Sequence, residues 1–550
     1  MENRAILAAI LMVGLLLLYQ ALFAPFSPPP PLEHPPAKAE PTRPTRGEPP
    51  PPPPPKVERT SPVRQRTTVV ETPLYRAVVA NDGGRLLEWV LNYRGDKPIV
   101  VPGALASRGL SVHRAGSEGE VLAFSEVGTT RLSLEPERPR GRLRLVGQDA
   151  FGLEVSEELE FQAEDYAVEA HIAAENRHTV RQVVELLLPW STLREWSDEE
   201  GEAFQGQHPT RVVWLGRDGV HREDLGEVTK TVSEGRWIGL ESEWYITALV
   251  PRSPGFKLVV TPNGDGVIEV GLKAAPPPLA PGERWEGRVV LYLGPKEYDR
   301  LEKIGAGLEQ SINVNLLWWI FVPLLRLMNF LYGLIPNYGV AIILVTVITK
   351  TLFYPLTYKG MMSMRAMQKK MHGMQPELNA LKAKHQKDPK RLQQEQMDLY
   401  KKHGVNPLGG LGGCLPMVVQ MPIFLSLYWV FSLAVELQNA PFLCFGTLFG
   451  TDLWICDLAQ RDPTYVLPIL MGVSMFVQQK MTPVVGDPRQ AKMMQFMPVM
   501  FTFFFLNLPS GLVLYWCVSN ILQIMQQYYI DRWGRPVRGS IKPVKGAQRA

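Results

Sequence analysis

The chain has 550 residues and a formal net charge of +4 at pH 7, with 45% hydrophobic and 20% charged residues. The length is too great for one ordinary domain, and the averages conceal a polar first half and an apolar second half. The 4 cysteines all lie in the apolar half and lack the paired C-x-x-C spacing of a zinc or redox site, which argues against both classes.

The first segment, Ala5–Ala24, is apolar and long enough to span a bilayer. A cleavable signal would need a small residue where Leu22 stands and would leave Pro25 directly after the cut, so residues 1–24 are interpreted as an uncleaved anchor. Residues 25–62 are dominated by proline, which favours an extended polyproline II tether. A role as an SH3-type ligand is the weaker alternative, because it suits neither the topology nor the compartment.

Short apolar and β-branched runs, such as Tyr75–Val79 and Lys257–Val260, alternate with turn residues through residues 63–295. This pattern predicts an all-β sandwich. Its histidines show no ligand spacing and no nucleophile–base motif occurs, so a binding or scaffolding domain is expected rather than an enzyme.

Residues 296–336 contain an apolar stretch interrupted by Pro323, Arg326 and Asn329, which fits an amphipathic helix at the membrane interface better than a span. Membrane spans are predicted after it, and only a tight turn separates the last two. They cover residues 337–358, 417–436, 465–481, 494–508 and 511–530.

The distribution of basic residues predicts the orientation, because cytoplasmic loops carry an excess of Lys and Arg. The loop 359–416 is rich in both, whereas Arg461 is the only basic residue in the loop 437–464. The first loop, the loop 482–493, the basic tail 531–550 and the N-terminus are therefore predicted to be cytoplasmic. The β domain and the second loop are predicted to be periplasmic.

Lys350 lies alone in the apolar run Val340–Tyr354. A charge at membrane depth costs roughly 2.5–3.5 kcal/mol on insertion scales and marks a functional site by default, although a lysine near the cytoplasmic end can also snorkel. Thr346 lies one turn away on the same helix face. Other polar side chains in the spans either line the same pocket or bond between helices. These are Gln420, Gln478, Asn520 and Gln523, and the final span adds Tyr515 and Trp516.

The loop 359–416 has helical spacing over Ser363–Met374 and Pro376–Lys387 and again, after the break at Asp388–Pro389, over Arg391–Lys402, which predicts a basic helical hairpin. Its first segment has an adaptable methionine-rich side. Substrate contact there and simple packing on the membrane surface are equally compatible with the pattern. The candidate contact residues are Met364, Met367, Met371, Lys369 and Lys370.

Cys444 and Cys456 share the predicted periplasmic loop, so a disulfide is possible there, although two loop cysteines are more often unpaired. None of the predicted spans contains His or Asp, and Glu436 lies at a span end, which argues against a Ser–His intramembrane protease or a carboxylate proton relay. The chain has no G-x-x-x-x-G-K-[ST] loop, so no nucleotide-driven motor is evident.

Short motifs across residues 315–530 together resemble the YidC family of membrane protein insertases, in its long Gram-negative form. The anchor, tether and β domain agree with that form with less specificity. The motifs are Tyr354–Thr357 (YPLT), Asn406–Gly410 (NPLGG), Gln420–Phe424 (QMPIF), Leu467–Gly472 (LPILMG), Phe496–Pro498 (FMP) and Pro509–Trp516 (PSGLVLYW).

The resemblance implies a multi-domain membrane protein with an all-α core of five transmembrane helices, an N-terminal anchor helix and a large all-β periplasmic sandwich. It also implies a hydrophilic groove, in which Lys350 stands where the family usually has arginine. Thr346, Gln420 and Trp516 fall where the family lines this groove, and Tyr515 beside Trp516 is included in the candidate site.

The expected function is insertion and folding of nascent membrane proteins in the bacterial inner membrane, without nucleotide, covalent chemistry or cofactor. The expected partners are these nascent proteins, a Sec-type translocon, ribosomes and anionic lipids, the last two through the basic loop and tail; DNA is not expected. A solute transporter is one alternative, and it predicts inverted repeats that residues 338–436 and 465–530 do not show. A structural assembly factor is the other, and it predicts that Lys350 is dispensable.

Overall fold

The structure is a computed structural model that describes residues 66–533, except for gaps at 94–95, 101–108, 115–118, 128–129, 194–208, 263–265, 313, 315–316, 360, 363–372, 386–387, 404–410, 449–450 and 482–487. The chain divides into two compact units, Met1–Pro53 with Met361–Gly413 and Pro54–Gly360 with Cys414–Ala550. The predicted anchor, the tether and most of the basic tail lie outside the described residues.

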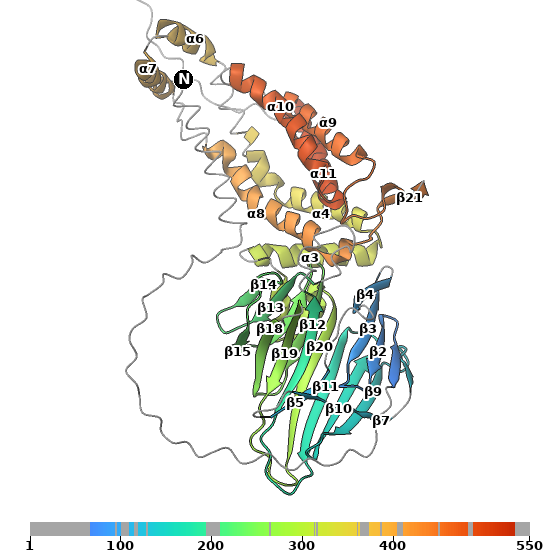
Figure 1. The fold of residues 1–550 in the computed structure, drawn as a ribbon. Helices are drawn as coiled ribbons and strands as arrows, with labels where there is room; N and C mark the ends of the chain where they lie inside the picture. Colours follow the sequence, from blue (N-terminus) through green and yellow to red (C-terminus); the bar gives the residue numbers. More distant parts are fainter. Residues whose placement is uncertain are drawn as a thin grey trace, which may run out of the picture. The chain divides into compact units, whose positions relative to one another are not determined.

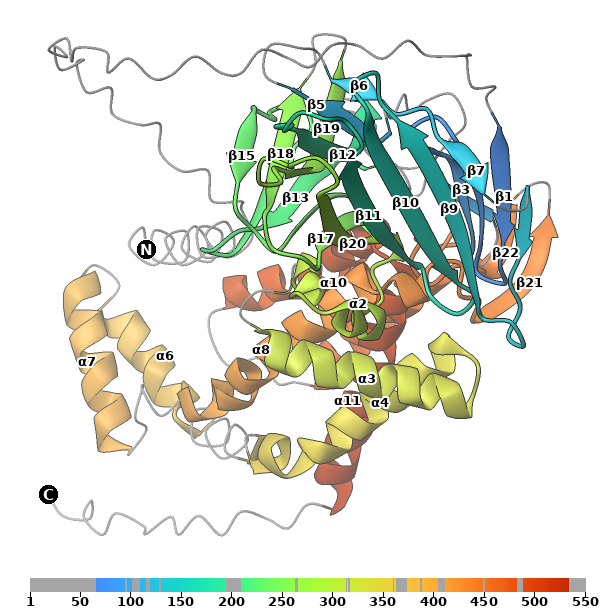
Figure 2. The ribbon, with the colours of Figure 1, turned by 90° about the horizontal axis from the view of Figure 1, so that it is seen from below.

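Three sheets build the β domain (Figure 1). The five-stranded sheet has the order β4-β3-β2-β1-β8, the nine-stranded sheet β14-β13-β16-β17-β20-β11-β10-β9-β7, and the six-stranded sheet β15-β18-β19-β12-β5-β6. Described neighbours pair antiparallel except β1 and β8, which pair in parallel. Figure 2 shows β9, β10 and β11 side by side.

The strands of the five-stranded sheet are β1 (Thr67–Glu71), β2 (Tyr75–Ala80), β3 (Leu86–Asn92), β4 (Asp96–Val100) and β8 (Arg131–Ser133). Those of the nine-stranded sheet are β7 (Ser125–Val127), β9 (Arg140–Gln148), β10 (Leu153–Gln162), β11 (Ala167–Asn176), β13 (Arg211–Leu215), β14 (Val220–Asp224), β16 (Trp237–Glu241), β17 (Tyr245–Pro251) and β20 (Arg284–Pro295). Those of the six-stranded sheet are β5 (Ser111–His113), β6 (Glu120–Val121), β12 (Glu185–Leu193), β15 (Thr231–Ser233), β18 (Phe256–Pro262) and β19 (Val267–Ala274).

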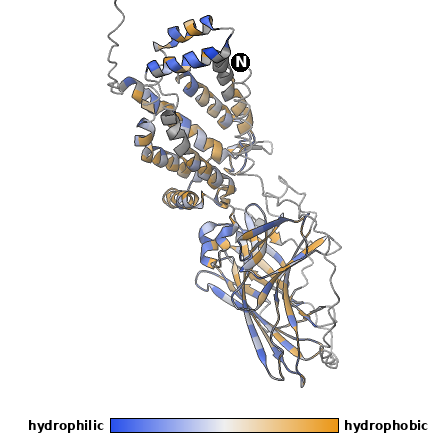
Figure 3. Cartoon of the chain, turned by 90° about the vertical axis from the view of Figure 1, so that its left-hand side faces the viewer, coloured by the Kyte–Doolittle hydropathy of each residue, from blue (hydrophilic) through white to orange (hydrophobic). Residues whose placement is uncertain are grey.

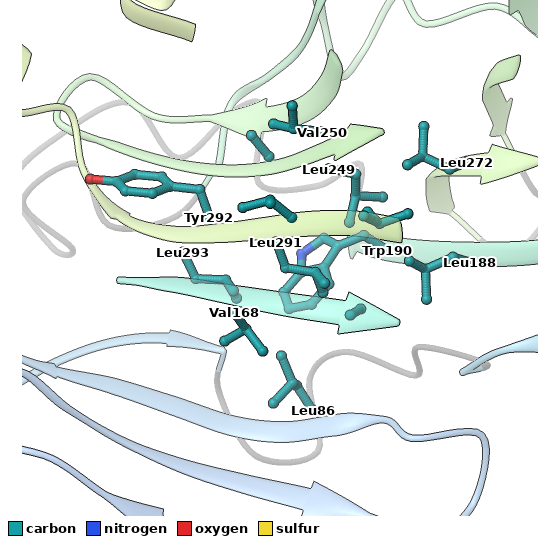
Figure 4. Packing of buried hydrophobic residues seen from close by; sticks show 14 of the residues in the cluster. Leu86, Val168, Leu188, Trp190, Leu249, Val250, Leu272, Leu291, Tyr292 and Leu293 are labelled. Atoms are coloured by element: carbon teal, nitrogen blue, oxygen red, sulfur yellow. The ribbon is translucent and has the colours of Figure 1, made fainter. Parts of the chain in front are cut away.

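Alternating side chains produce the core of this domain. Along β10, Leu153, Val155 and Phe161 are fully buried, whereas the alternate residues Glu154, Ser156 and Glu158 are partly exposed. A strand whose successive side chains point to opposite faces buries one row of this kind against a second sheet. Figure 4 shows Trp190 of β12 beside Leu291 of β20 within the core. The prediction of a β-rich domain ahead of the helical region is confirmed.

The apolar core continues past the predicted domain end at residue 295. Two short helices follow β20, α2 (Tyr298–Ile304) and η2 (Leu308–Ser311). Leu301 and Leu308 are fully buried in the same hydrophobic cluster as the strands. A residue from far along the chain, Val435, belongs to that cluster too.

Helix α3 (Trp318–Leu334) is amphipathic, as the sequence predicts. It buries Phe321, Leu325 and Met328 on one face. On another face Arg326 pairs with Asp299 at 3.2 Å and with Glu302 at 2.7 Å, both on α2. Its location at a membrane interface stays a prediction.

The remaining helices of the same unit are α4 (Tyr338–Leu352), α8 (Leu411–Leu433), η5 (Val435–Leu437), α9 (Val466–Met481), α10 (Pro488–Phe505) and α11 (Ser510–Trp533). Helix α4 ends at Leu352, and after a turn at Phe353 residues 354–359 are helical again, which carries the helical course past the predicted boundary at residue 358. Helices α8 and α10 start ahead of the predicted residues 417 and 494.

Orange predominates on these helices in Figure 3, where it marks hydrophobic residues. Measured over the described residues, no helix combines the length and the apolar composition of a membrane-spanning segment.

The loop between α8 and α9 contains a β-hairpin that the sequence reasoning did not predict, formed by β21 (Leu443–Leu448) and β22 (Thr451–Ile455). A disulfide joins Cys444 to Cys456 across it.

The other unit contains the hairpin helices α6 (Gln375–Lys384) and α7 (Pro389–Lys402), where the sequence predicts helical segments. His403 of the segment after α7 bonds Glu377 of α6 at 3.2 Å, and His385 lies 3.1 Å from Glu395 of α7.

Candidate functional site

A row of polar side chains runs along α11, which lies beside both α4 and α9 (Figure 1). The row consists of Asn520, Gln523, Gln526 and Gln527. Their spacing of three, four and seven residues places them on one broad side of the helix. Each of them hydrogen-bonds a neighbouring helix, so the row joins α11 to the elements on its two sides.

Lys350 of α4 is the charged member of this cluster. Its Nζ donates a hydrogen bond to Oε1 of Gln523 at 3.1 Å, and its side chain is half-buried. No acidic side chain in the described part of the chain lies within ion-pair distance of Lys350. The bonded partner of the Lys350 amine is therefore a neutral amide rather than a carboxylate.

A second bond continues the contact between α4 and α11 toward the end of α11. Nε2 of Gln526 donates to Oγ1 of Thr357 at 3.1 Å. Thr357 follows Lys350 by seven residues, two helical turns, in the segment beyond the break at Phe353. The two amides, one turn apart on α11, thus contact both sides of that break.

Helix α9 meets the other flank of the polar row. Nδ2 of Asn520 donates to Oγ of the buried Ser474 at 3.2 Å, and Nε2 of Gln527 donates to the carbonyl oxygen of Met481 at 2.9 Å. In an apolar environment such bonds hold helices together, because an unbonded amide there is costly. These contacts orient α11 so that Gln523 faces α4.

The predicted site residues do not all gather around Lys350. Thr346 is fully buried, and its Oγ1 bonds the carbonyl oxygen of Ile342 within its own helix at 2.6 Å. Trp516 packs edge-on against Phe424, with ring centroids 4.8 Å apart, and against Phe505 at 4.7 Å.

Tyr515 is buried, and its ring lies 5.6 Å from that of Phe431. The aromatic pair Tyr515 and Trp516 thus packs near the start of α11, about two turns before Gln523 at 1.5 Å of rise per residue. Aromatic packing with α8 and α10 is the role that these contacts give the pair.

The side chains of several predicted site residues lie outside the described part of the structure. Gln420 belongs to α8, but its side chain lies outside the described residues. The predicted hairpin contacts Met364, Met367, Met371, Lys369 and Lys370 lie in the gap at 363–372.

The sequence reasoning named Gln523 and Asn520 as polar residues in a span but did not assign them to the site, and it did not consider Gln526, Gln527 or Ser474. Their helical spacing on α11 is the signal that groups them. The pairing of Lys350 with Gln523 is visible only in the structure.

The described residues contain no candidate metal-binding site. Across the described ranges, His, Cys, Asp and Glu form no group of three that could hold a metal ion.

Two family profiles match the chain along most of its length. Residues 67–327 match the family described as "YidC periplasmic domain", and residues 330–536 match the one described as "60Kd inner membrane protein". Together with the β-rich domain and the helical C-terminal region, these matches define an inner-membrane protein with a periplasmic domain.

Individual relatives agree along nearly the whole chain. A membrane protein insertase YidC of Syntrophus aciditrophicus is 35% identical, covering 97% of this chain and 100% of the relative. One of Geobacter metallireducens is 34% identical, covering 97% and 98%. A crystal structure of an active YidC insertase is 22% identical with a TM-score of 0.36, covering 86% of this chain and 94% of that one. The chain belongs to the YidC family.

Proposed function

We propose that this protein inserts nascent membrane proteins into the inner membrane and that Lys350 attracts the polar, often acidic, N-terminal segment of the substrate. Its relatives at about one-third identity are membrane protein insertases, which supports the general function. The observation that carries the mechanism is a half-buried ammonium whose bonded partner, Gln523, is neutral. A cation without a neutralising carboxylate attracts an acidic segment across a low-dielectric surrounding.

We further propose that α4, α8, α9, α10 and α11 cross the membrane. Helix α10 supports this, because its exposed side chains include Phe496, Val499, Met500, Phe503 and Phe504. They recur at intervals of three and four residues, which makes one continuous apolar face. Such a face is costly in water and is stabilised by lipid.

Insertion then needs neither nucleotide nor covalent chemistry. A polar pocket around Lys350 lowers the cost of bringing the polar segment partway across the bilayer. The hydrophobic segment of the substrate moves into lipid, and burial of its apolar surface drives the step at about 25 cal/mol per Å². The membrane potential adds ~2.3 kcal/mol per charge per 100 mV.

The charge of the cytoplasmic segments indicates further partners. The basic loop 359–416 and the tail 531–550 attract ribosomes or anionic lipids through phosphate groups, with both segments in the cytoplasm. A Sec-type translocon is a further proposed partner. The basic residues of the tail can equally serve to orient the last helix, because cytoplasmic segments carry an excess of Lys and Arg.

The test is protease protection of a single-span substrate in liposomes that contain the purified full-length protein and no nucleotide. We expect insertion by the unaltered protein and by Lys350→Arg, which retains the charge, and at least a tenfold loss with Lys350→Ala, the equivalent of about 1.4 kcal/mol. Lys480→Ala is the matched control, because it removes an exposed lysine of α9 that lies over the Phe476 ring.

Equal insertion by the unaltered protein and Lys350→Ala would leave an insertase without a groove cation. If the unaltered protein inserted nothing but conducted a solute, the transporter alternative would replace the proposal.

A further inference from the structure

The Lys350 side chain has a long, flexible stem, so something must decide where its ammonium lies. A lysine near a membrane surface lowers its free energy by extending toward water. In this structure the ammonium instead points across to α11 and meets Oε1 of Gln523 at 3.1 Å. The position of Gln523 therefore determines the position of the charge.

Gln523 is itself held by its neighbours on α11. One turn earlier Asn520 bonds Ser474 of α9, and one turn later Gln526 bonds Thr357. Helix α11 is thereby fixed on both sides at the level of Gln523, so the amide oxygen has little freedom to move away from α4.

Because the acceptor Gln523 is neutral, its effect on the Lys350 charge differs from that of a carboxylate. A carboxylate at this place would form an ion pair with Lys350 and cancel its attraction for an acidic substrate. The amide oxygen orients the ammonium and leaves the charge intact. It also uses one of the three donors of the ammonium, so two remain for a substrate carboxylate.

We propose that Gln523 is a positioning residue, which holds the Lys350 ammonium between α4 and α11 with its charge available to acidic substrate segments. This inference rests on the proposed function of Lys350 and adds a residue on which that function depends.

The experiment compares two substrates that differ only in the N-terminal segment, one with aspartates and one with asparagines at the same positions. The readout is the ratio of their insertion in nucleotide-free liposomes. A merely structural role for Gln523 would lower both insertions together and leave this ratio unchanged.

Gln523→Glu keeps the shape of the side chain and supplies a carboxylate. We expect it to lower the acidic-to-neutral ratio about tenfold, the effect of one lost charge interaction. Gln523→Leu removes the acceptor, and a smaller fall of about threefold is expected because the ammonium then extends toward water. Lys350→Arg should restore the ratio in the Gln523→Leu background, because guanidinium has five donors and a rigid fork that depends less on one acceptor.

Lys480→Ala is the matched control, because it removes an exposed side chain of α9 that lies over the Phe476 ring, outside the polar row. Its ratio should equal that of the unaltered protein. If Gln523→Leu is not recovered folded, Gln523→Glu alone carries the test.

Two failures are distinguishable. An unchanged ratio in Lys350→Ala overturns the proposed role of Lys350 together with the positioning role of Gln523. A fall in Lys350→Ala with unchanged ratios in Gln523→Glu and Gln523→Leu overturns the positioning role alone.

Discussion

Glu157 occupies a position on β10 where the alternation requires an apolar side chain. It lies in the inward row between Val155 and Leu159, is 2% exposed, and pairs in register with Leu145 and Ile172. Its Oε2 is buried without a hydrogen-bond partner among the described residues. Burial raises the pKa of this carboxyl from 4.5 to about 8, because the charged form loses its hydration.

The glycine turn between β2 and β3 closes over this carboxyl. A Cβ on Gly84 would lie 2.1 Å from Oε2 of Glu157, and the residue has a positive φ of 66°. Glycine is the residue that adopts this backbone without strain and leaves room for the carboxyl. The turn and the carboxyl line a small cavity of about 30 Å³ together with Trp190.

Stability should therefore fall with rising pH on account of Glu157. Between pH 4.5 and about 8 the folded protein keeps a proton that the unfolded chain has released. The contribution of Glu157 to the free energy of unfolding is thus full below pH 4.5, declines by about 1.4 kcal/mol per pH unit through this window, and is constant above it. Thermal unfolding of the full-length protein at several pH values measures the slope.

Glu157→Gln is the control, because it removes the titration and nearly retains the volume. Its melting temperature should vary less between pH 5 and pH 8 than that of the unaltered protein. Identical pH dependence in the two proteins would mean that Glu157 is already ionised in the fold.

Sequence reasoning found Lys350 but not its partner, and the two cases differ physically. A lone charge in an apolar run is visible locally, since its cost does not depend on the fold. The bond to Gln523 depends on which faces of α4 and α11 meet, and a residue far along the chain decides that. The ring contacts of Tyr515 and Trp516 with α8 and α10 likewise join residues that are distant in the chain, and the place of both residues in the groove stays a prediction.

At the scale of elements, hydropathy predicts where an apolar helix lies better than where it ends. The predicted span 465–481 agrees with α9 (Val466–Met481) to within a residue. Helix α10 starts ahead of its predicted boundary, because Pro488 suits the first turn of a helix and the polar residues after it are compatible with one. The sequence does not predict the hairpin β21–β22, because its strands are short. A disulfide between Cys444 and Cys456 closes this hairpin.

Helices α9 and α10 approach closely at a glycine. A Cβ added to Gly472 would lie 2.1 Å from Oγ1 of Thr502, whose hydroxyl bonds the carbonyl oxygen of Pro498. Small residues allow helix backbones to pack at short range where the hydrophobic effect does not drive association. The contact thus fixes the spacing of this helix pair.

Gly472→Ala should destabilise the protein by about 1–3 kcal/mol, because the added methyl forces α10 outward or Thr502 into another rotamer. Thermal unfolding in detergent measures the change. Thr502→Ala in the same chain should recover most of it by removing the hydroxyl. Gly333→Ala on α3 is the control, since a Cβ there has no atom within 4 Å and should be neutral or slightly stabilising. If Gly472→Ala were as stable as the unaltered protein, helices α9 and α10 would have room for the added methyl group at this contact.

At the scale of the whole molecule, the β domain and the segment leading to α3 share one core. Leu301, Ile304 and Leu308 are buried against the strands, and Val435 from the segment after α8 joins them. The hydroxyl of Tyr245 on β17 also donates to Oε1 of Gln438 near the end of the same segment. The composition change at residue 295 ends the strands but not the core, because short helices complete it.

Removal of the β domain should therefore succeed or fail according to where the chain is cut. Deletion of residues 66–295 leaves the apolar side chains of α2 and η2 without their partners, whereas deletion of residues 66–312 removes them as well. Exposed apolar surface of this kind favours aggregation. We expect the longer deletion to be recovered as a monodisperse protein and the shorter one to aggregate, which size-exclusion chromatography in detergent measures.

The longer deletion also separates the two ways in which the protein can act on a substrate. If Lys350 and its neighbours on α11 carry insertion, that variant should retain most of the nucleotide-free insertion of the single-span substrate, and adding Lys350→Ala to it should remove what is left. A structural assembly factor working through its β domain predicts the reverse, with insertion lost in the deletion and unchanged by Lys350→Ala. Because every step uses one substrate and one readout, the comparison assigns the activity to the helical region or to the sheets.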